Sequence, residues 1–169
     1  MFGRFAIIGA IALSIFVVGK AANFVTGAGG KAPVVTVANE DAEVNAAHAK
    51  AKRTIGEFWA ALERKRANEK NFAMKVRFPI KGYKDSGEHM WITDIRREGP
   101  GAYSGRLDNE PEYITDFSIG QRVTFSDAMI SDWMFTRNGK IVGNESMRPL
   151  LAHLPKEKAD KLRTMLENP

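Results

Sequence analysis

Three histidines are the side chains in this sequence best suited to acid–base or metal chemistry. They are His48, His89 and His153, and no two of them have His-x-His or His-x-x-x-His spacing. Such spacings present two ligands from one strand or one helix to a metal ion. The chain has no cysteine, which excludes zinc–thiolate sites, thiol nucleophiles and disulfides. We therefore expect neither a metal ion nor a cofactor.

One group of polar and aromatic residues could form a site. Its members are Glu88, His89, Trp91, Asp132, Trp133 and Arg148. A His89–Asp132 pair would supply general-base chemistry if the carboxylate oriented the imidazole and both side chains lined a cleft. The two tryptophans, flanked by charged residues, would instead suit a groove for a peptide or protein, because Trp and Arg are common interface anchors.

The same residues also permit a purely structural interpretation. Both indoles would then pack in the core or at its rim, with their N–H groups bonded to nearby carbonyls. Asp132 would cap a turn or pair with Arg148, and His89 would be a satisfied polar residue near a sheet edge. Alternation along a strand puts Glu88 and His89 on opposite faces, so both reach one site only if Glu88 lies in the preceding turn.

The spacing of apolar residues predicts the elements that position these side chains. Spacings of three and four predict a helix from Asn39 to about Arg66, and strict alternation predicts a half-buried strand over 72–80 with Lys75 on the face opposite the apolar side chains. Asn138-Gly139 predicts a type I′ hairpin turn, since both central residues need positive φ. Further strands are predicted over residues 88–97, 102–107, 122–125, 130–136 and 141–143, and short helices near 147–153 and from 155 onward.

This order of elements predicts an α+β fold. A long N-terminal helix is followed by about five antiparallel strands and then by short C-terminal helices, and such segregation of helices from strands is typical of α+β domains. The strand lengths and tight turns suit a strongly bent antiparallel sheet or a small, partly open barrel, with the long helix packed on it. Residues 108–116 contain four acids and no base, so we expect a surface loop there.

Several motifs recur in a known pattern. They are Glu88-His89-Met90-Trp91, Gly105-Arg106-Leu107-Asp108-Asn109-x-Pro111, Ile119-Gly120-Gln121-x-Val123-x-Phe125, Ile130-x-Asp132-Trp133-Met134 and Met147-Arg148-x-Leu150. With them, residues 44–152 resemble the bacterial YegJ-type domain of unknown function. The resemblance implies a recurring bacterial module, with members that are exported behind a short hydrophobic leader, and it implies no particular activity.

A hydrophobic segment without charged side chains runs from Phe5 to Gly19, between Arg4 and Lys20. Its 15 residues suit a signal peptide, since a membrane-spanning helix needs ~20. The segment would be long enough for a membrane anchor if the helix continued to Val25 and the Lys20 side chain extended its ammonium group to the membrane surface. A segment of this length can also be a buried core helix.

The chain is therefore predicted to have three parts. We expect a signal peptide or membrane anchor at residues 1–25, a flexible linker at 26–38 and a single YegJ-like α+β domain at 39–169. Within the linker, residues 32–38 are β-branched around Pro33 and could be extended or form an edge strand.

Charge and location narrow the expected function. Of the net charge of +5, three units come from Arg4, Lys20 and Lys31 in a segment without acids. The remainder is close to balanced, so we do not expect nucleic-acid binding. We expect an exported protein, anchored in the inner membrane or periplasmic, that binds a peptide or protein partner in the cell envelope without catalysis. The alternative is a weak hydrolase or glycan-processing enzyme that uses His89 and Asp132.

Overall fold

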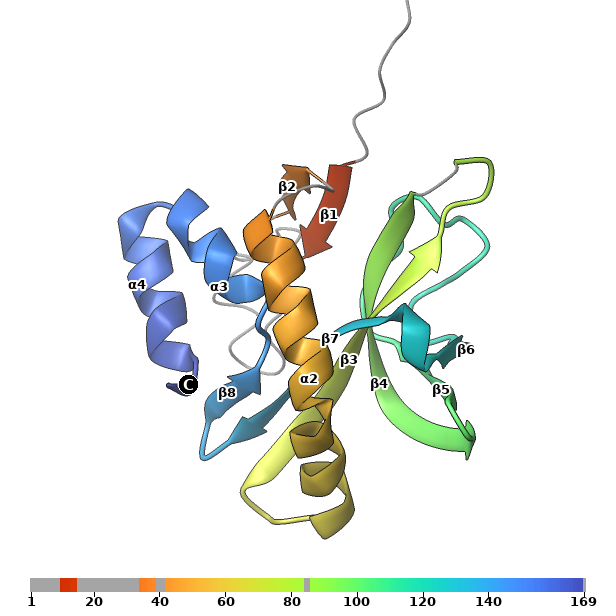
Figure 1. Cartoon of the computed structure of the whole chain (residues 1–169), viewed down its shortest axis with the longest axis horizontal. Helices are drawn as coiled ribbons and strands as arrows, with labels where there is room; N and C mark the ends of the chain where they lie inside the picture. The colour runs from red at the N-terminus through yellow and green to blue at the C-terminus, as the bar shows by residue number, and fades with distance from the viewer. Residues whose placement is uncertain (1–9, 15–33, 39–41, 84–85, 169) are drawn as a thin grey trace, which may run out of the picture.

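A six-stranded antiparallel sheet crossed by one long helix forms the body of the protein (Figure 1). The computed structural model describes residues 10–14, 34–38, 42–83 and 86–168. The sheet has the order β6-β5-β4-β3-β7-β8 and is not closed. Its strands are β3 (Glu69–Pro79), β4 (Gly87–Gly99), β5 (Ala102–Leu107), β6 (Arg122–Ser126), β7 (Ile130–Arg137) and β8 (Lys140–Gly143). The helices are α2 (Ala42–Arg64), α3 (Met147–Leu150) and α4 (Lys156–Met165), with 3₁₀ turns η1 (Asp127–Met129) and η2 (Leu151–His153). The predicted α+β class is confirmed.

Two further strands lie where the sequence predicted a leader and a linker. β1 (Ala10–Ser14) pairs in antiparallel fashion with β2 (Val34–Ala38). Of the two structures predicted for the end of the linker, an extended segment or an edge strand, the strand is the one that forms. The other residues before Ala42, including the predicted helix start at Asn39, lie outside the described residues. No helix within the described ranges is long and apolar enough to cross a membrane. The signal peptide or anchor at residues 1–25 stays a prediction.

The helix α2 packs on the sheet through one stripe of its surface. Val44, Ala51, Phe58 and Ala61 are buried at helical spacing. The indole N–H of Trp133 on β7 donates to the carbonyl oxygen of Ala51 at 2.8 Å. This bond and the apolar stripe fasten the middle of α2 to the sheet.

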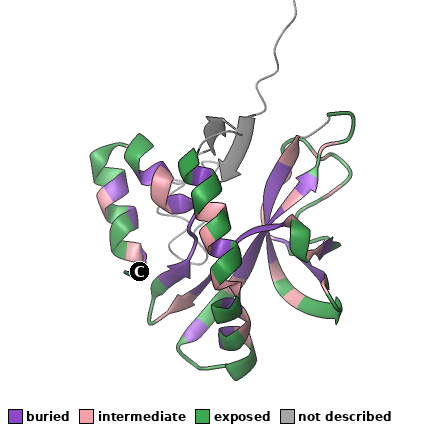
Figure 2. Ribbon diagram, in the orientation of Figure 1, coloured by how far each residue is buried: buried purple, intermediate pink, exposed green. Residues whose placement is uncertain are grey.

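The strand β3 is buried on both faces, which the sequence did not predict. It lies between β4 and β7 in the sheet, so its backbone is paired on both sides. Met74, Val76 and Phe78 belong to a core cluster shared with the middle of α2, while Ala73 faces a second cluster that includes residues of α3 and α4. Lys75, predicted to lie on a solvated face, is 2% exposed. Figure 2 shows this continuous burial through the centre of the sheet.

Irregular backbone at a few positions bends the sheet and reverses the chain. The register shifts in β3 between Lys70 and Ala73, where Asn71 has φ 56°, and such bulges bend a strand. In the β7–β8 hairpin, Asn138 has φ 50° and Gly139 has φ 78°. The predicted type I′ turn is therefore confirmed.

Candidate functional site

The structure does not bring the six predicted site residues together on one surface. Five of them are buried, with exposed fractions from 0% for Asp132 to 4% for Glu88 and His89. Trp91 and Trp133 lie in different core clusters, so the two indoles do not present a shared docking surface. Of the six, Arg148 has a partly exposed side chain.

Glu88 holds the acidic loop that follows β5. Its carboxylate accepts the backbone N–H groups of Glu112 at 2.6 Å, Tyr113 at 3.0 Å and Ile114 at 3.0 Å. Three backbone donors satisfy a buried carboxylate without a cation. Glu88 therefore anchors the loop, and it points away from the face that carries His89, as alternation predicted.

His89 is bonded to a serine and stacked on a second histidine. Its Nδ1 lies 2.8 Å from the hydroxyl oxygen of Ser131, and its ring stacks on that of His48 with centroids 5.3 Å apart. Burial lowers the pKa of His48 to about 4 and that of His89 to about 2, with nearby Lys75 adding to both shifts. Both imidazoles are therefore neutral near pH 7. No hydrogen bond joins His89 to Asp132 among the described contacts, so the His–carboxylate pair that the enzyme alternative would use does not form.

Asp132 instead holds the start of α3. Its carboxylate accepts the N–H of Ser146 at 2.8 Å, the hydroxyl of Ser146 at 2.6 Å and the N–H of Glu145 at 3.2 Å. It also accepts the N–H of Trp133 at 2.8 Å. The prediction that Asp132 caps a turn is thus confirmed, whereas Arg148 pairs with Glu145 at 3.2 Å rather than with Asp132.

Lys75 completes this buried network. Its ammonium donates to the Ser146 hydroxyl at 2.8 Å and lies 4.8 Å from the centroid of the Trp91 ring. Burial lowers the pKa of Lys75 to about 8, while the charge of Asp132 acts in the opposite direction. The indole N–H of Trp91 is buried and has no hydrogen-bond partner among the described residues, whereas the corresponding group of Trp133 is bonded as predicted.

The Lys75–Ser146 contact has the composition of a lysine base beside a serine nucleophile. Ser146, however, is 0% exposed, and its hydroxyl proton is directed at Asp132. A nucleophile must reach its substrate, and a buried hydroxyl cannot. The Lys75–Ser146–Asp132 bonds therefore have a structural role, in which they hold β3, β7 and the start of α3 together. Across the described ranges, no three His, Asp or Glu side chains are grouped so that they could hold a metal ion.

A cleft lies beside this network, where polar side chains reach solvent. It has a volume of about 340 Å³ and lies between α2, β8, the start of α3 and the segment after α4. Its lining residues are Lys50, Thr54, Glu57, Trp133, Val142, Gly143, Glu145, Arg148, Glu167 and Asn168. Two of the six predicted residues, Trp133 and Arg148, therefore contribute to it.

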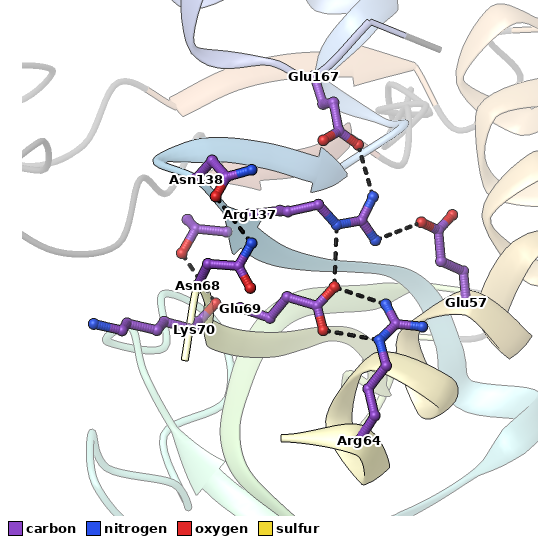
Figure 3. Close-up of polar contacts among 9 residues, drawn as sticks. Glu57, Arg64, Asn68, Glu69, Lys70, Arg137, Asn138 and Glu167 are labelled. Atoms are coloured by element: carbon purple, nitrogen blue, oxygen red, sulfur yellow. Dashed lines mark hydrogen bonds and ion pairs between the residues drawn. The ribbon is translucent and has the colours of Figure 1, made fainter. Parts of the chain in front are cut away.

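Two ion-pair networks flank the cleft. In one, Glu145 receives Lys50 at 3.0 Å and Arg148 at 3.2 Å. In the other, the guanidinium of Arg137 contacts Glu57 at 3.0 Å and Glu167 at 3.2 Å. Figure 3 shows Arg137 at the centre of the second network.

The Arg137 network continues into the sheet. Arg137 contacts Glu69 of β3 at 3.1 Å, and Glu69 also receives Arg64 at the end of α2 at 2.7 Å. Hydrogen bonding to Arg64 lowers the pKa of Glu69. The paired charges fix the position of α2 and β7 at this end of the cleft.

Sequence reasoning did not identify most of the cleft residues. Lys50, Glu57 and Glu145 come from segments that have no recognisable motif, and they meet only because α2 packs on β7, the strand with which β8 is paired. The available signal was the adjacency of Arg148 to Asn144-Glu145-Ser146 just after the β7–β8 hairpin.

Comparison with known proteins identifies the family. Residues 41–165 match the family described as "Uncharacterized protein conserved in bacteria (DUF2314)". The chain belongs to this family. The DUF2314 match spans α2, the six-stranded sheet, α3 and α4, and the resemblance to the YegJ-type domain is confirmed.

Two relatives show how the DUF2314 domain recurs. The chain is 36% identical to "Uncharacterized protein YegJ" of Escherichia coli over 116 residues, which cover 69% of this chain and 72% of that protein. It is 35% identical over 134 residues to a putative ankyrin repeat protein of Neisseria meningitidis serogroup B, covering 76% of this chain and 52% of that protein. The chain thus spans about half the length of the second relative. No solved structure matches the chain.

Proposed function

We propose that this domain is a non-enzymatic binding module of the bacterial cell envelope, which engages a protein or peptide partner in the cleft beside Trp133 and Arg148. The observation that carries the proposal is the contrast between two places. The groups suited to catalysis are sequestered in the core, whereas the cleft offers ionised side chains of both signs to solvent.

The character of the cleft supports a macromolecular partner. Lys50 and Glu57 have side chains that are 40% and 44% exposed, so each can form a further bond with a partner while keeping its ion pair. Charged rims around a less polar base favour orientation and specificity in recognition. The hydrolase alternative is not favoured, because His89 and Asp132 bond to Ser131 and Ser146 rather than to each other.

Two further observations support the wider setting. One relative is named a putative ankyrin repeat protein, and repeat arrays of this kind form extended binding surfaces. By analogy, we propose that the DUF2314 domain acts as one binding unit that works together with other binding units. The uncharged segment from Phe5 to Gly19 after Arg4 supports an envelope location.

Filling the cleft tests the proposal. Thr54→Trp places a large ring at the cleft wall, whereas Ala60→Trp places the same ring on an exposed position of α2 outside the cleft lining. We would express each full-length variant with an affinity tag in a bacterium that carries the native gene, cross-link intact cells and identify the captured proteins by mass spectrometry. Partners captured by the native chain and by Ala60→Trp should be lost with Thr54→Trp. Equal capture by all three chains would exclude the cleft as the binding site.

A further inference from the structure

The segment after α4 lies along the outer edge of β8. β8 is the last strand of the sheet, so one side of it has no neighbour within the six-stranded order. Leu166 forms a parallel bridge with Ile141, and the N–H of Glu167 donates to the carbonyl oxygen of Ile141 at 2.7 Å. The sheet's other pairings are antiparallel. The segment is therefore added to the edge as a short extended peptide would be.

Side chains of the domain hold this segment at two positions. Leu166 is 6% exposed and packs in the cluster that contains Ile141, Met147 and Leu162. Next to it, the Glu167 carboxylate lies 3.2 Å from Arg137, and the backbone carbonyl oxygen of Glu167 accepts a bond from Arg148 at 3.1 Å. Figure 3 shows Glu167 directed at the Arg137 guanidinium. An apolar pocket followed by an arginine that faces the next side chain is a recognition pattern for an apolar residue followed by an acid, and Arg148 adds a bond to the backbone of the segment.

The family match includes the β8 edge but not the segment that lies on it. The DUF2314 match runs over residues 41–165 and so includes β8, Arg137 and Arg148. Leu166 and Glu167 lie beyond it. The cleft is lined by Gly143 at the end of β8 and by Glu167 and Asn168, so the edge and the cleft form one continuous surface.

We propose that the β8 edge is a binding site for an extended peptide with an apolar residue followed by Glu or Asp, and that residues 166–168 of this chain occupy it until such a partner displaces them. This inference rests on the proposed function and names the chemistry of its partner. The partner strand would pair with the Ile141 backbone and place its apolar side chain in the Leu166 pocket. Its carboxylate would lie against Arg137, and its backbone carbonyl would accept a bond from Arg148.

A peptide added in trans tests the inference. The probe is a labelled synthetic peptide with the sequence of residues 164–169, Thr-Met-Leu-Glu-Asn-Pro, and binding is measured by fluorescence anisotropy. The receptors are the native full-length chain, Glu167→Arg, and the double variant Leu166→Asp/Glu167→Arg, in which the tethered segment is released. A tethered competitor has an effective concentration in the millimolar range. We therefore expect the probe to bind the double variant at least tenfold more tightly than the native chain, with Glu167→Arg between them.

Controls separate this inference from loss of folding. Circular dichroism spectra and melting curves show which variants are folded, and Glu167→Arg keeps Leu166 in its pocket if the double variant does not fold. A second probe with Gln in place of Glu should bind at least tenfold more weakly than the first. Equal binding of the first probe to native and released chains, or no binding to a folded released chain, would overturn the inference.

Two outcomes distinguish this inference from the proposed function. If the probe fails to bind but Thr54→Trp still abolishes capture in cells, the cleft binds partners of other chemistry and the edge proposal falls. If the native chain forms stable dimers that both released variants lose, as seen by analytical ultracentrifugation, the occupant is a second copy of the chain and the proposal of a separate peptide partner fails.

Discussion

Lys75 and Asp132 place opposite charges in the interior of the domain, joined through the hydroxyl of Ser146. Each charge needs the other, because an ion left in the core without a partner loses its hydration and gains nothing in return. The four hydrogen bonds received by Asp132 and the bond from Lys75 to Ser146 satisfy the network. This mutual dependence leads to a prediction about pairs of substitutions.

A double-mutant cycle should reveal strong coupling between Lys75 and Asp132. Lys75→Met and Asp132→Asn should each lower the free energy of unfolding by about 3 kcal/mol, since each leaves one buried charge unpaired. The double variant should lose less than the sum, by more than about 1 kcal/mol. Urea denaturation at pH 7 measures all four chains.

The matched control for this cycle is the exposed pair Lys156–Asp160 on α4. Lys156→Met and Asp160→Asn should each leave the urea midpoint almost unchanged, because solvent screens an exposed ion pair. Additive effects at Lys75 and Asp132 would show that the two charges are compensated separately.

The buried histidines predict a pH dependence of stability. The pKa values of His48 and His89 are lowered to about 4 and about 2, so the unfolded chain binds protons below pH 6.5 that the folded chain does not. Stability should therefore fall as the pH is lowered from 6.5 toward 4, by about 1.4 kcal/mol per pH unit for each histidine. Denaturation at a series of pH values measures the slope.

Substitution of His89 checks the origin of that slope. His89→Asn retains an amide that can bond to Ser131 but cannot be protonated. The pH slope of the free energy of unfolding between pH 6.5 and 4 should therefore decrease by about 1.4 kcal/mol per pH unit, the contribution of one bound proton. His48→Asn/His89→Asn should remove a second proton. A slope unchanged in both variants would assign the acid sensitivity to other groups.

At the scale of elements, the loop after β5 depends on β4. Glu88→Gln would remove the charge that receives the N–H groups of Glu112, Tyr113 and Ile114. The free energy of unfolding should fall by about 1–3 kcal/mol. Hydrogen exchange of those three amides should become faster through local opening of the loop, whereas the β3 amides should exchange only through global unfolding. Glu110→Gln, exposed in the same loop, is the control and should leave exchange of the three amides unchanged.

The end of β8 requires glycine for steric reasons. Gly143 has φ 77°, and a Cβ atom there would overlap the carbonyl oxygen and the ring of Trp133. Gly143→Ala should therefore cost about 3 kcal/mol, from the left-handed backbone and from the displaced Trp133. Gly139 has a similar φ of 78° but open space around its Cα, so Gly139→Ala should cost about 1 kcal/mol. Equal melting temperatures of the two variants would show that β8 can move away from Trp133.

At the scale of the whole molecule, the cleft depends on how the helices cover the two faces of the sheet. One core cluster packs under the middle of α2 and the other under α3 and α4. The cleft lies where α2, β8 and the segment after α4 meet, and the ion pairs of Arg137 and Glu145 join these elements beside it. Figure 3 shows the pairs of Arg137. The binding surface is thus a property of the assembled domain rather than of any one element.

Local patterns were sufficient for much of the fold. The apolar stripe of α2, the alternation of β3 and the Asn138-Gly139 turn depend on residues close in sequence, and their predicted positions agree with the structure to within a few residues at the ends. The α+β class follows from their order, because helices and strands occur in separate runs. Turn chemistry and periodicity act over short distances, so a sequence shows them directly.

Contacts between distant residues were decided by the tertiary structure. Alternation showed that Lys75 faces away from Met74 and Val76, but it did not show that α3 would cover that face and bring Ser146, 71 positions later, to its ammonium. The same applies to His89 and Asp132, whose neighbours proved to be Ser131 and Ser146, and to Glu167, which reaches Arg137 across the β8 edge. The sequence by itself determined which residues share a face, since that depends on backbone geometry. The covering of each face depends on how the elements pack, and packing is a property of the whole chain.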